Sequence, residues 1–272
     1  MNNLIVRTVT GFFFVASIIG SILLGHGWFS ALFFVITLAT LVEFFRLIKQ
    51  RSGVEVQLIT GTIAGVLIYL LASLAAMQII ALKYLVISLV LPLILFLYEL
   101  FRKKETPFLN VSVTIVGIIY IAIPFSALNF ILNPGLVAEE YHPANLIVFF
   151  VILWTYDTFA YLTGMMLGRH RLLERVSPKK SWEGAAGGFL FGLLAAWIVA
   201  LIMHRIDFAI LAGEALIIMF FGTFGDLVES LLKRSLNVKD SGNILPGHGG
   251  MLDRFDAVLF ATPAVLIYYL LI

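Results

Sequence analysis

Long apolar runs separated by short polar connections make up most of this chain. A helix rises about 1.5 Å per residue, so it needs about 20 apolar residues to cross the roughly 30 Å of a bilayer's hydrocarbon core. The pattern offers about nine such runs, near residues 8–25, 28–47, 57–80, 83–101, 108–132, 144–168, 184–204, 208–232 and 252–272. The weakest division follows the third run, because only residues 81–83 separate it from the fourth. The pattern predicts an all-α, polytopic integral membrane protein with about nine transmembrane helices.

Composition supports lipid rather than water as the solvent of these helices. Of the 272 residues, 61% are hydrophobic and 12% are charged, whereas soluble domains have roughly 45–50% apolar and about 25% charged residues. The net charge of +2 does not favour a nucleic-acid binder, and the absence of cysteine excludes disulfides, thiolate catalysis and cysteine-based zinc sites. The first apolar run is expected to be a retained helix, because no small-residue cleavage site precedes Trp28.

Basic residues are distributed unevenly among the connections. With the N-terminus inside, every lysine and arginine except Lys83 and Arg205 lies on the inner side, and the outer connection near 136–142 has two glutamates and no cation. Lysine and arginine in short loops favour the cytoplasmic side. We therefore expect a cytoplasmic N-terminus, in a cell (inner) membrane, and an odd number of spans. The segments 169–182 and 230–256 then both face the cytoplasm.

The two parts of the chain differ in polar content. Residues 1–142 are interpreted as a scaffold of transmembrane helices, and residues 143–272, which hold most of the intramembrane polar groups, as the domain that carries the chemistry. The acids of the first part are each followed three residues later by an arginine: Glu43 by Arg46 and Glu99 by Arg102. A local ion pair, or snorkelling to the interface, is the favoured interpretation of both acids.

Small residues mark two helices of the second part. In one of them they recur every fourth residue, at Gly184, Gly188, Gly192 and Ala196. This spacing predicts close contact between helix backbones in lipid. In the other, Gly222 and Gly225 precede an acid, which indicates a loosened or kinked helix that opens onto a wet cavity.

That acid, Asp226, lies well inside an apolar run. A carboxylate in lipid costs at least about 2.5–3.5 kcal/mol, so it must face protein, water or a cation. Glu229, Ser230 and Lys233 follow at helical spacing and share its face. One interpretation is an internal ion pair with Lys233 or Arg234. The other is a metal ligand at a polar cavity.

Two further acids begin the last apolar run. Asp253 and Asp256 flank Arg254 and fall in the first turn of the predicted helix, where the helix dipole alone favours an acid. Two acids facing Asp226 across a short loop are better explained by a divalent ion, and an all-oxygen ligand set favours Mg²⁺ over zinc. Asp240 either joins these ligands or pairs within the loop.

The connection 242–250 is rich in glycine and includes Gly249 and Gly250. Glycines let the backbone approach a ligand and point N–H groups at an anion. The surrounding cations, which make a phosphate cradle credible, are Lys233, Arg234, Lys239 and Arg254. His248 either fixes the loop by a hydrogen bond or contacts phosphate.

A second polar cluster supports the first. Asp157 lies inside an apolar run, where a hydrogen bond to a neighbouring Tyr or Thr is the simplest interpretation, and the segment 177–184 presents Lys179 and Lys180 after a Ser-Pro turn. The lysines would contribute about 1 kcal/mol each as contacts to anionic lipid. They also suit an anion site at a helix start. Because this segment and the glycine loop face the same side, one phosphate-bearing ligand would reach both.

These residues resemble the signature of the phosphatidate cytidylyltransferases, also called CDP-diacylglycerol synthases. The matching positions are Ser230, Lys233, Arg234, Lys239, Asp240, Gly242, Leu245, Pro246, His248, Gly249, Gly250, Asp253, Arg254 and Asp256. The segment 177–184 and the pair Asp157 and Tyr161 also look like family blocks. The resemblance covers about 130 residues, and residues 1–142 match only as a hydrophobic bundle.

The resemblance implies that CTP and phosphatidic acid react to give CDP-diacylglycerol and pyrophosphate, with Mg²⁺. One or two divalent ions are expected on Asp226, Asp253 and Asp256, and an additional monovalent cation is left open. The catalytic residues would be these three acids and Lys233. The phosphate-binding residues would be Lys179, Lys180, Ser230, Arg234, Lys239, His248, Gly249, Gly250 and Arg254. A homodimer in the bilayer is compatible with this reading.

Three other functions remain open from the residues alone. A related transferase would use another nucleotide or a polyprenol or dolichol acceptor. A transporter would use the intramembrane acids Asp157, Glu214 and Asp226 as ion or proton sites. A structural membrane scaffold would need these acids for stability only.

Overall fold

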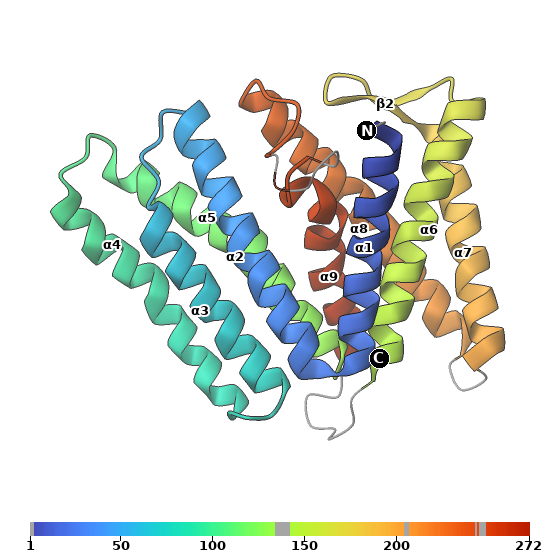
Figure 1. Cartoon of the computed structure of the whole chain (residues 1–272), viewed down its shortest axis with the longest axis horizontal. Helices are drawn as coiled ribbons and strands as arrows, with labels where there is room; N and C mark the ends of the chain where they lie inside the picture. The colour runs from blue at the N-terminus through green and yellow to red at the C-terminus, as the bar shows by residue number, and fades with distance from the viewer. Residues whose placement is uncertain (1–2, 134–141, 204–206, 243, 245–248) are drawn as a thin grey trace.

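The protein is a bundle of long helices with one small hairpin (Figure 1). The computed structural model describes residues 3–133, 142–203, 207–242, 244 and 249–272. The α-helices are α1 (Asn3–Leu24), α2 (His26–Arg51), α3 (Leu58–Ala76), α4 (Val90–Arg102), α5 (Pro107–Ile131), α6 (Pro143–Leu167), α7 (Trp182–Met203), α8 (Phe208–Ser235) and α9 (Leu252–Leu271). A 3-10 helix, η1 (Leu82–Leu89), leads into α4, and strands β1 (Arg171–Leu173) and β2 (Ser177–Ser181) form the hairpin.

Every predicted apolar run lies on a helix. In the described part of the chain, eight helical segments are long and apolar enough to cross a membrane, and α1 contributes a shorter apolar stretch, Thr8–Leu24. The third and fourth apolar runs are separate helical segments, as predicted, because α3 ends at Ala76 and η1 begins at Leu82. The prediction of an all-α, polytopic membrane protein is confirmed.

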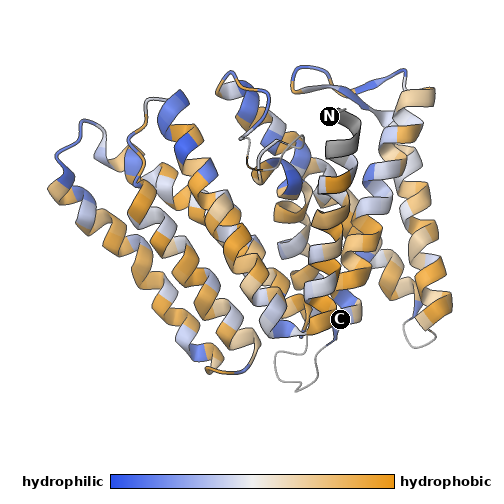
Figure 2. Ribbon diagram, viewed as in Figure 1, coloured by the Kyte–Doolittle hydropathy of each residue, from blue (hydrophilic) through white to orange (hydrophobic). Residues whose placement is uncertain are grey.

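Polar residues gather at the ends of this bundle. Figure 2 shows hydrophobic residues along the length of the helices and hydrophilic ones mostly at the upper ends and connections. The hairpin, the α2–α3 connection, the α4–α5 connection and the start of α9 all lie at this upper end (Figure 1). The segments expected to share one side of the membrane therefore share one end of the protein.

Local sequence explains where several helices begin and end. Pro107 and Pro143 occupy the first turns of α5 and α6, where a missing backbone N–H has no intrahelical partner to lose. The carboxylate of Asp207 caps α8 by accepting a hydrogen bond from the backbone N–H of Ala209 at 2.9 Å. Lys103 ends α4 in the left-handed conformation, with φ of 50°.

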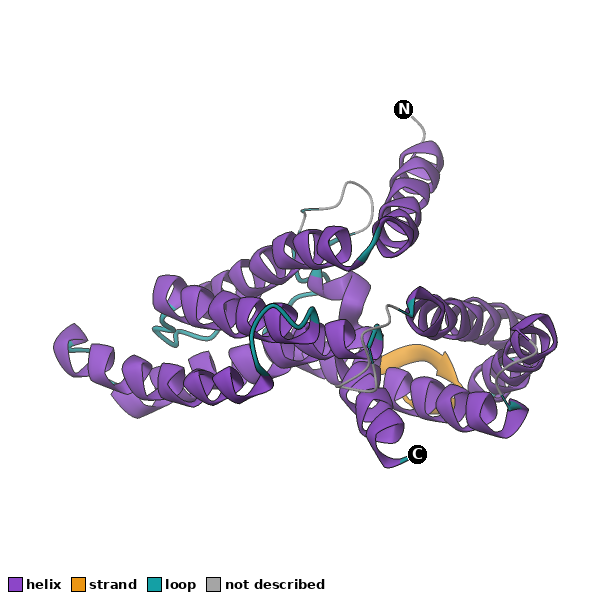
Figure 3. Ribbon diagram, turned by 90° about the horizontal axis from the view of Figure 1, so that it is seen from below, coloured by secondary structure: helices purple, strands orange, loops and turns teal. Residues whose placement is uncertain are grey.

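The two halves of the sequence share one hydrophobic core. Figure 3 views the helices from below. The contacts between helices place α9 against both α5 and α8. Phe255 of α9 packs edge-on against Phe125 of α5 and Phe33 of α2, with ring centroids 5.2 and 5.7 Å apart. Such aromatic pairs contribute about 0.5–1.5 kcal/mol each beyond their burial. The N-terminal helices are therefore packed directly against the start of α9.

The predicted small-residue seam joins α7 to its neighbours. A Cβ atom at Gly184 would lie 3.0 Å from the Cα of Gly164 in α6, and one at Gly188 would lie 2.6 Å from the ring of Tyr156. Gly192 approaches Met219 of α8 as closely. The seam is confirmed, since any larger side chain would push these helices apart.

The other glycine pair has a different role from the one predicted. α8 is an unbroken α-helix from Phe208 to Ser235, so Gly222 and Gly225 do not interrupt it. They instead admit close neighbours, because a Cβ at Gly225 would meet the backbone of α9 and one at Gly222 would lie 3.2 Å from the side chain of Leu153.

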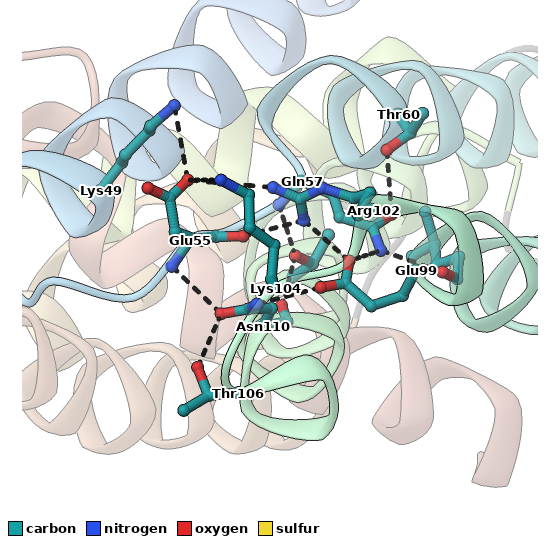
Figure 4. Close-up of polar contacts among 11 residues, drawn as sticks. Lys49, Glu55, Gln57, Thr60, Glu99, Arg102, Lys104, Thr106 and Asn110 are labelled. Atoms are coloured by element: carbon teal, nitrogen blue, oxygen red, sulfur yellow. Dashed lines mark hydrogen bonds and ion pairs between the residues drawn. The ribbon is translucent and has the colours of Figure 1, made fainter.

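Glu99 follows the predicted local pairing. Its carboxylate is 4% exposed and lies 2.7 Å from the guanidinium of Arg102, and it accepts hydrogen bonds from Gln57 at 2.6 Å and Asn110 at 2.9 Å. Figure 4 shows this network beside Glu55, around which other cations gather. The network ties α4 to α5 and to the start of α3.

Candidate functional site

The site begins where α8 crosses α9. The absence of a side chain at Gly225 lets the carbonyl oxygen of Asp256 and the Cα of Ala257 pack against α8. This contact brings Asp226 and Asp256 within electrostatic reach of each other, and Asp157 of α6 interacts with Asp256 as well. The three carboxylates, from three helices, form what we call the acidic cluster (Asp157, Asp226 and Asp256).

A lysine from the hairpin reaches this cluster. The ammonium nitrogen of Lys180 lies 2.5 Å from Oδ2 of Asp226, and the hydroxyl of Ser230 donates a hydrogen bond to Oδ1 of Asp226 at 3.2 Å. The alternative in which Asp226 pairs with Lys233 or Arg234 is therefore wrong, because Asp226 pairs with a residue predicted to belong to a second cluster. The two predicted clusters are one site.

Lys233, about two helical turns beyond Asp226 in α8, belongs to a different ion network. Its ammonium nitrogen lies 2.5 Å from Oε2 of Glu229 and 2.7 Å from Oδ1 of Asp253. Glu229 is fully buried. The sequence placed Glu229 on the same face of the helix as Asp226 but gave it no role, and only the contact with Lys233 reveals one.

Asp253 holds the glycine loop as well as Lys233. Its Oδ2 accepts hydrogen bonds from the backbone N–H groups of Ser241, at 3.0 Å, and Gly250, at 2.8 Å. Gly249 has φ of 86°, a conformation that favours glycine, and a Cβ there would lie 2.6 Å from Asp253. Both oxygens of Asp253 are thus engaged by protein groups.

The remaining predicted residues lie around this arrangement. Arg234 donates a hydrogen bond to the carbonyl oxygen of Val238 at 3.3 Å, and Lys239 and Asp240 are exposed at the loop. The backbone N–H of Gly250 points to a carboxylate rather than outward. Three signature positions, Leu245, Pro246 and His248, fall outside the described residues.

Two cavities meet at Asp157. One, of about 340 Å³, lies between α1, α6 and α9, where apolar side chains such as Phe14 and Phe150 face Asp157, Arg254 and Asp256. The other, of about 490 Å³, lies between α6, α7 and the hairpin. Its lining includes Tyr156, Asp157, Arg171, Lys179, Lys180 and Thr223. The first cavity therefore brings apolar side chains of α1 and α6 together with one cation, Arg254, and the second is lined by the three cations Arg171, Lys179 and Lys180.

A hydrogen bond between helices fixes the wall of the second cavity. The hydroxyl groups of Tyr156 in α6 and Thr223 in α8 are bonded to each other, and Thr223 also donates to the carbonyl oxygen of Met219. Asp157, the next residue along α6, lines both cavities, and the hydroxyl of Tyr156 is bonded to Thr223 rather than to Asp157. Asp157 therefore belongs to the site and does not form the predicted hydrogen bond to the neighbouring Tyr156.

The residues fit Mg²⁺ only in part. Within the described ranges, no group of three or more His, Cys, Asp or Glu side chains is arranged to hold a metal ion. Mg²⁺, however, usually keeps several waters and takes one or two carboxylates together with substrate phosphates. Asp226 and Asp256 supply oxygens of this kind, and in the described structure Lys180 pairs with Asp226. The oxygens of Asp253 are taken up, so its role as a ligand stays a prediction.

Comparison with known proteins shows the family to which the chain belongs. The model of the cytidylyltransferase family matches residues 5–272. The chain belongs to the cytidylyltransferase family. Because the match includes α1 to α5, the family extends over the N-terminal half, which the signature residues alone did not reach.

Bacterial relatives have one name in common. The chain is 37% identical over 222 residues to the phosphatidate cytidylyltransferase of Staphylococcus aureus (strain COL), covering 80% of this chain and 72% of that protein. It is 40% identical over 186 residues to that of Bacillus subtilis (strain 168), covering 68% and 67%. It is 41% identical over 137 residues to that of Thermotoga maritima, covering 48% and 51%. The chain is a multi-pass membrane protein of this family.

Proposed function

We propose that this chain transfers the cytidylyl group of CTP to phosphatidate, giving CDP-diacylglycerol and pyrophosphate for phospholipid synthesis. The observation that carries the proposal is the meeting of the acidic cluster with Lys180 between a cavity lined by three cations and one in which Arg254 lies beside apolar side chains of α1 and α6. Substrates that are respectively a soluble polyanion and a lipid anion suit two such cavities. The names of the relatives supply the two substrates.

The reaction requires charge neutralisation more than a strong base. A phosphate oxygen of phosphatidate forms a bond to the α-phosphorus of CTP, and the bond from that phosphorus to the bridging oxygen of the β-phosphate breaks, releasing pyrophosphate. The attacking oxygen is already ionised at neutral pH, so no proton must be removed. Two anions must instead be brought together, and fixed positive charge at the reacting phosphates lowers this barrier.

The residues around the cavities divide this task. Lys180, with Lys179 and Arg171 behind it, faces phosphate groups that enter the cavity beside the hairpin. Arg254 lines the cavity between α1, α6 and α9. There it is placed for the phosphate of a lipid whose acyl chains lie against Phe14 and Phe150. Asp226 and Asp256 would hold Mg²⁺, which offsets phosphate charge when it is bound. Asp157 is positioned to support the same ion.

Asp253 and Lys233 act one step away from the phosphates in this proposal. Asp253 fixes the glycine loop through two backbone N–H groups, and Lys233 locks Asp253 to Glu229. Asp256 follows Asp253 in the same turn of α9. Holding Asp253 therefore also holds the orientation of Asp256 toward Asp226.

Placement in the membrane follows from the basic residues. The end of the bundle that carries the hairpin and the start of α9 also carries the basic connections, which favour the cytoplasmic side. We propose an active site at the cytoplasmic face of the bacterial inner membrane, where CTP is available, in a protein that forms homodimers through apolar helix faces.

Labelled nucleotide tests the reaction. Purified protein in detergent, given Mg²⁺, phosphatidate and CTP labelled in its α-phosphate, is expected to place the label in a chloroform-soluble product and to release one pyrophosphate per lipid. CTP labelled in the γ-phosphate is expected to leave the lipid unlabelled. Lipid labelled from the γ-phosphate would mean phosphoryl transfer, and labelling of dolichyl phosphate but not phosphatidate would mean another acceptor. Solute flux in proteoliposomes without any lipid product would favour a transporter.

A further inference from the structure

Glu43, in the N-terminal half, binds the segment that leads into α9. This side chain of α2 is only 6% exposed. Its Oε1 accepts hydrogen bonds from the hydroxyl of Ser241, at 2.5 Å, and the backbone N–H of Leu252, at 3.0 Å. Its Oε2 accepts one from the backbone N–H of Met251 at 2.8 Å. The predicted local pairing with Arg46 is therefore wrong, because both oxygens face residues some 200 positions along the chain.

These bonds supply a helix cap that α9 lacks in its own sequence. The first N–H groups of a helix have no partner within the helix and need an acceptor. Met251, at the N-cap position of α9, has no side chain that can accept such a bond. A carboxylate from α2 takes this place, and its negative charge also suits the positive end of the helix dipole. The start of α9 thus depends on a residue from another helix.

The glycines around the loop are shaped to fit this carboxylate. A Cβ atom at Gly242 would lie 2.6 Å from Oε2 of Glu43, and one at Gly250 would overlap Oε1. Asp253 meanwhile binds the backbone N–H groups of Ser241 and Gly250. Two carboxylates, Glu43 and Asp253, therefore hold the same two ends of the glycine loop from opposite halves of the sequence.

We propose that Glu43 is a positioning residue for cytidylyl transfer. By fixing the first turn of α9, it sets the direction in which Asp253 and Asp256 project, and so the approach of Asp256 to Asp226. It also gives the N-terminal half a part in the reaction beyond that of a scaffold. This inference rests on the proposed function, because the geometry that Glu43 sets is assigned to that reaction.

The variant that tests this role is Glu43→Gln, which keeps the size of the side chain. The amide oxygen can still accept from Ser241 and Leu252, but the amide NH₂ then faces the N–H of Met251, and the charge is lost. We expect kcat to fall by about 10- to 100-fold, as for other residues that orient a reactive group. The KM for phosphatidate is expected to change by less than about threefold, because Glu43 lines neither cavity.

Glu99→Gln is the matched control. Glu99 is similarly buried, lies in the N-terminal half and, like Glu43, accepts three hydrogen bonds, but these come from the side chains of Gln57, Arg102 and Asn110 rather than from the loop. This change is expected to lower thermal stability in detergent and to leave kcat per folded molecule unchanged. A wild-type kcat in folded Glu43→Gln, or an equal loss of kcat per folded molecule in both variants, would overturn the proposed role.

Hydrogen exchange separates this inference from the reaction itself. Peptides that span residues 249–256 are expected to exchange faster in Glu43→Gln than in the wild type, with no change in Glu99→Gln. Faster exchange in Glu43→Gln would support the cap even if the wild-type protein makes no CDP-diacylglycerol. That combination of results would overturn the proposed reaction and not the cap. Unchanged exchange at these residues would overturn the cap, whatever the activity.

Discussion

Lys180, on strand β2, places its ammonium nitrogen 2.5 Å from Oδ2 of Asp226 in α8. This contact connects the hairpin after α6 with a residue of α8 more than forty positions later, and it puts a cation at the edge of the acidic cluster. The hairpin holds the lysine in place by pairing Arg171 with Ser181 and Leu173 with Ser177. The predictions below follow from this arrangement.

Replacing Lys180 with methionine is expected to lower kcat/KM for CTP by about 100-fold. A charged group at the reacting phosphates stabilises the transition state by about 2.7–4 kcal/mol, and the lower figure corresponds to this loss. Steady-state rates with purified protein would measure this. Lys83→Met is the control and should give wild-type rates, since Lys83 is exposed in η1, the segment between α3 and α4, and lines neither cavity. An unchanged kcat/KM in Lys180→Met would remove Lys180 from the reaction.

Replacing Asp256 with asparagine should separate stability from activity. Burial and the nearby carboxylates of Asp226 and Asp157 both oppose a negative charge on Asp256, so at alkaline pH, where Asp256 is ionised, a neutral side chain removes this cost in the protein without ligands. We expect Tm without added metal to rise by about 2–4 °C, corresponding to about 1 kcal/mol, while activity falls at least about 100-fold. Thermal unfolding in detergent, with and without EDTA, would measure the first effect. A lower Tm in EDTA would contradict the proposed repulsion.

The dependence of the rate on Mg²⁺ should distinguish Asp226 from Asp253. Asp226→Asn is expected to raise the Mg²⁺ concentration for half-maximal rate by at least about tenfold, in line with the loss of a ligand. Asp253→Asn is expected to leave that concentration within about twofold and to lower stability by about 1–3 kcal/mol, because Lys233 loses a partner. A strong shift in the Mg²⁺ requirement of Asp253→Asn would instead restore Asp253 as a ligand. In the wild type, EDTA should abolish activity and Mg²⁺ should restore it.

The seam between α6 and α7 should tolerate no added side chain. Gly188→Leu would drive atoms into Tyr156 and Ala160, so we expect a loss of about 1–3 kcal/mol in the free energy of unfolding, or more. Gly20→Ala is the matched control, because nothing lies within 4 Å of a Cβ at this position of α1. It should be neutral or stabilising by up to about 1 kcal/mol. Chemical denaturation in detergent would compare the two, and equal stability would count against the seam.

Much of the architecture can be read from the chain in order. The apolar runs predict the helices because each segment of about 20 residues meets lipid on its own, independently of its neighbours. The small residues at Gly184, Gly188 and Gly192 predict a close contact for a similar reason, since their spacing matches one face of one helix. The hairpin was not predicted, because its strands are only 3 and 5 residues long and carry no alternating apolar pattern.

The sequence predicted which residues belong to the candidate site but not which of them contact each other. Asp226, Lys180, Asp253 and Asp256 were all chosen from the sequence, yet Asp226 pairs with Lys180, and Asp253 binds Lys233 and the loop instead of facing Asp226. Spacing along a helix shows which residues share a face. It does not show which face of the next helix lies opposite, because the crossing of α8 and α9 depends on Gly225.

By itself, the sequence determined that this is a multi-pass helical membrane protein with a polar site at the end that carries its basic connections. Hydropathy and charge act on each segment separately, so they can be read without knowing the neighbours. Only the tertiary structure decided that Glu43 caps α9 and that Glu229 holds Lys233. Those contacts depend on how helices distant in sequence pack, and a buried acid finds its partner among whatever groups that packing brings to it.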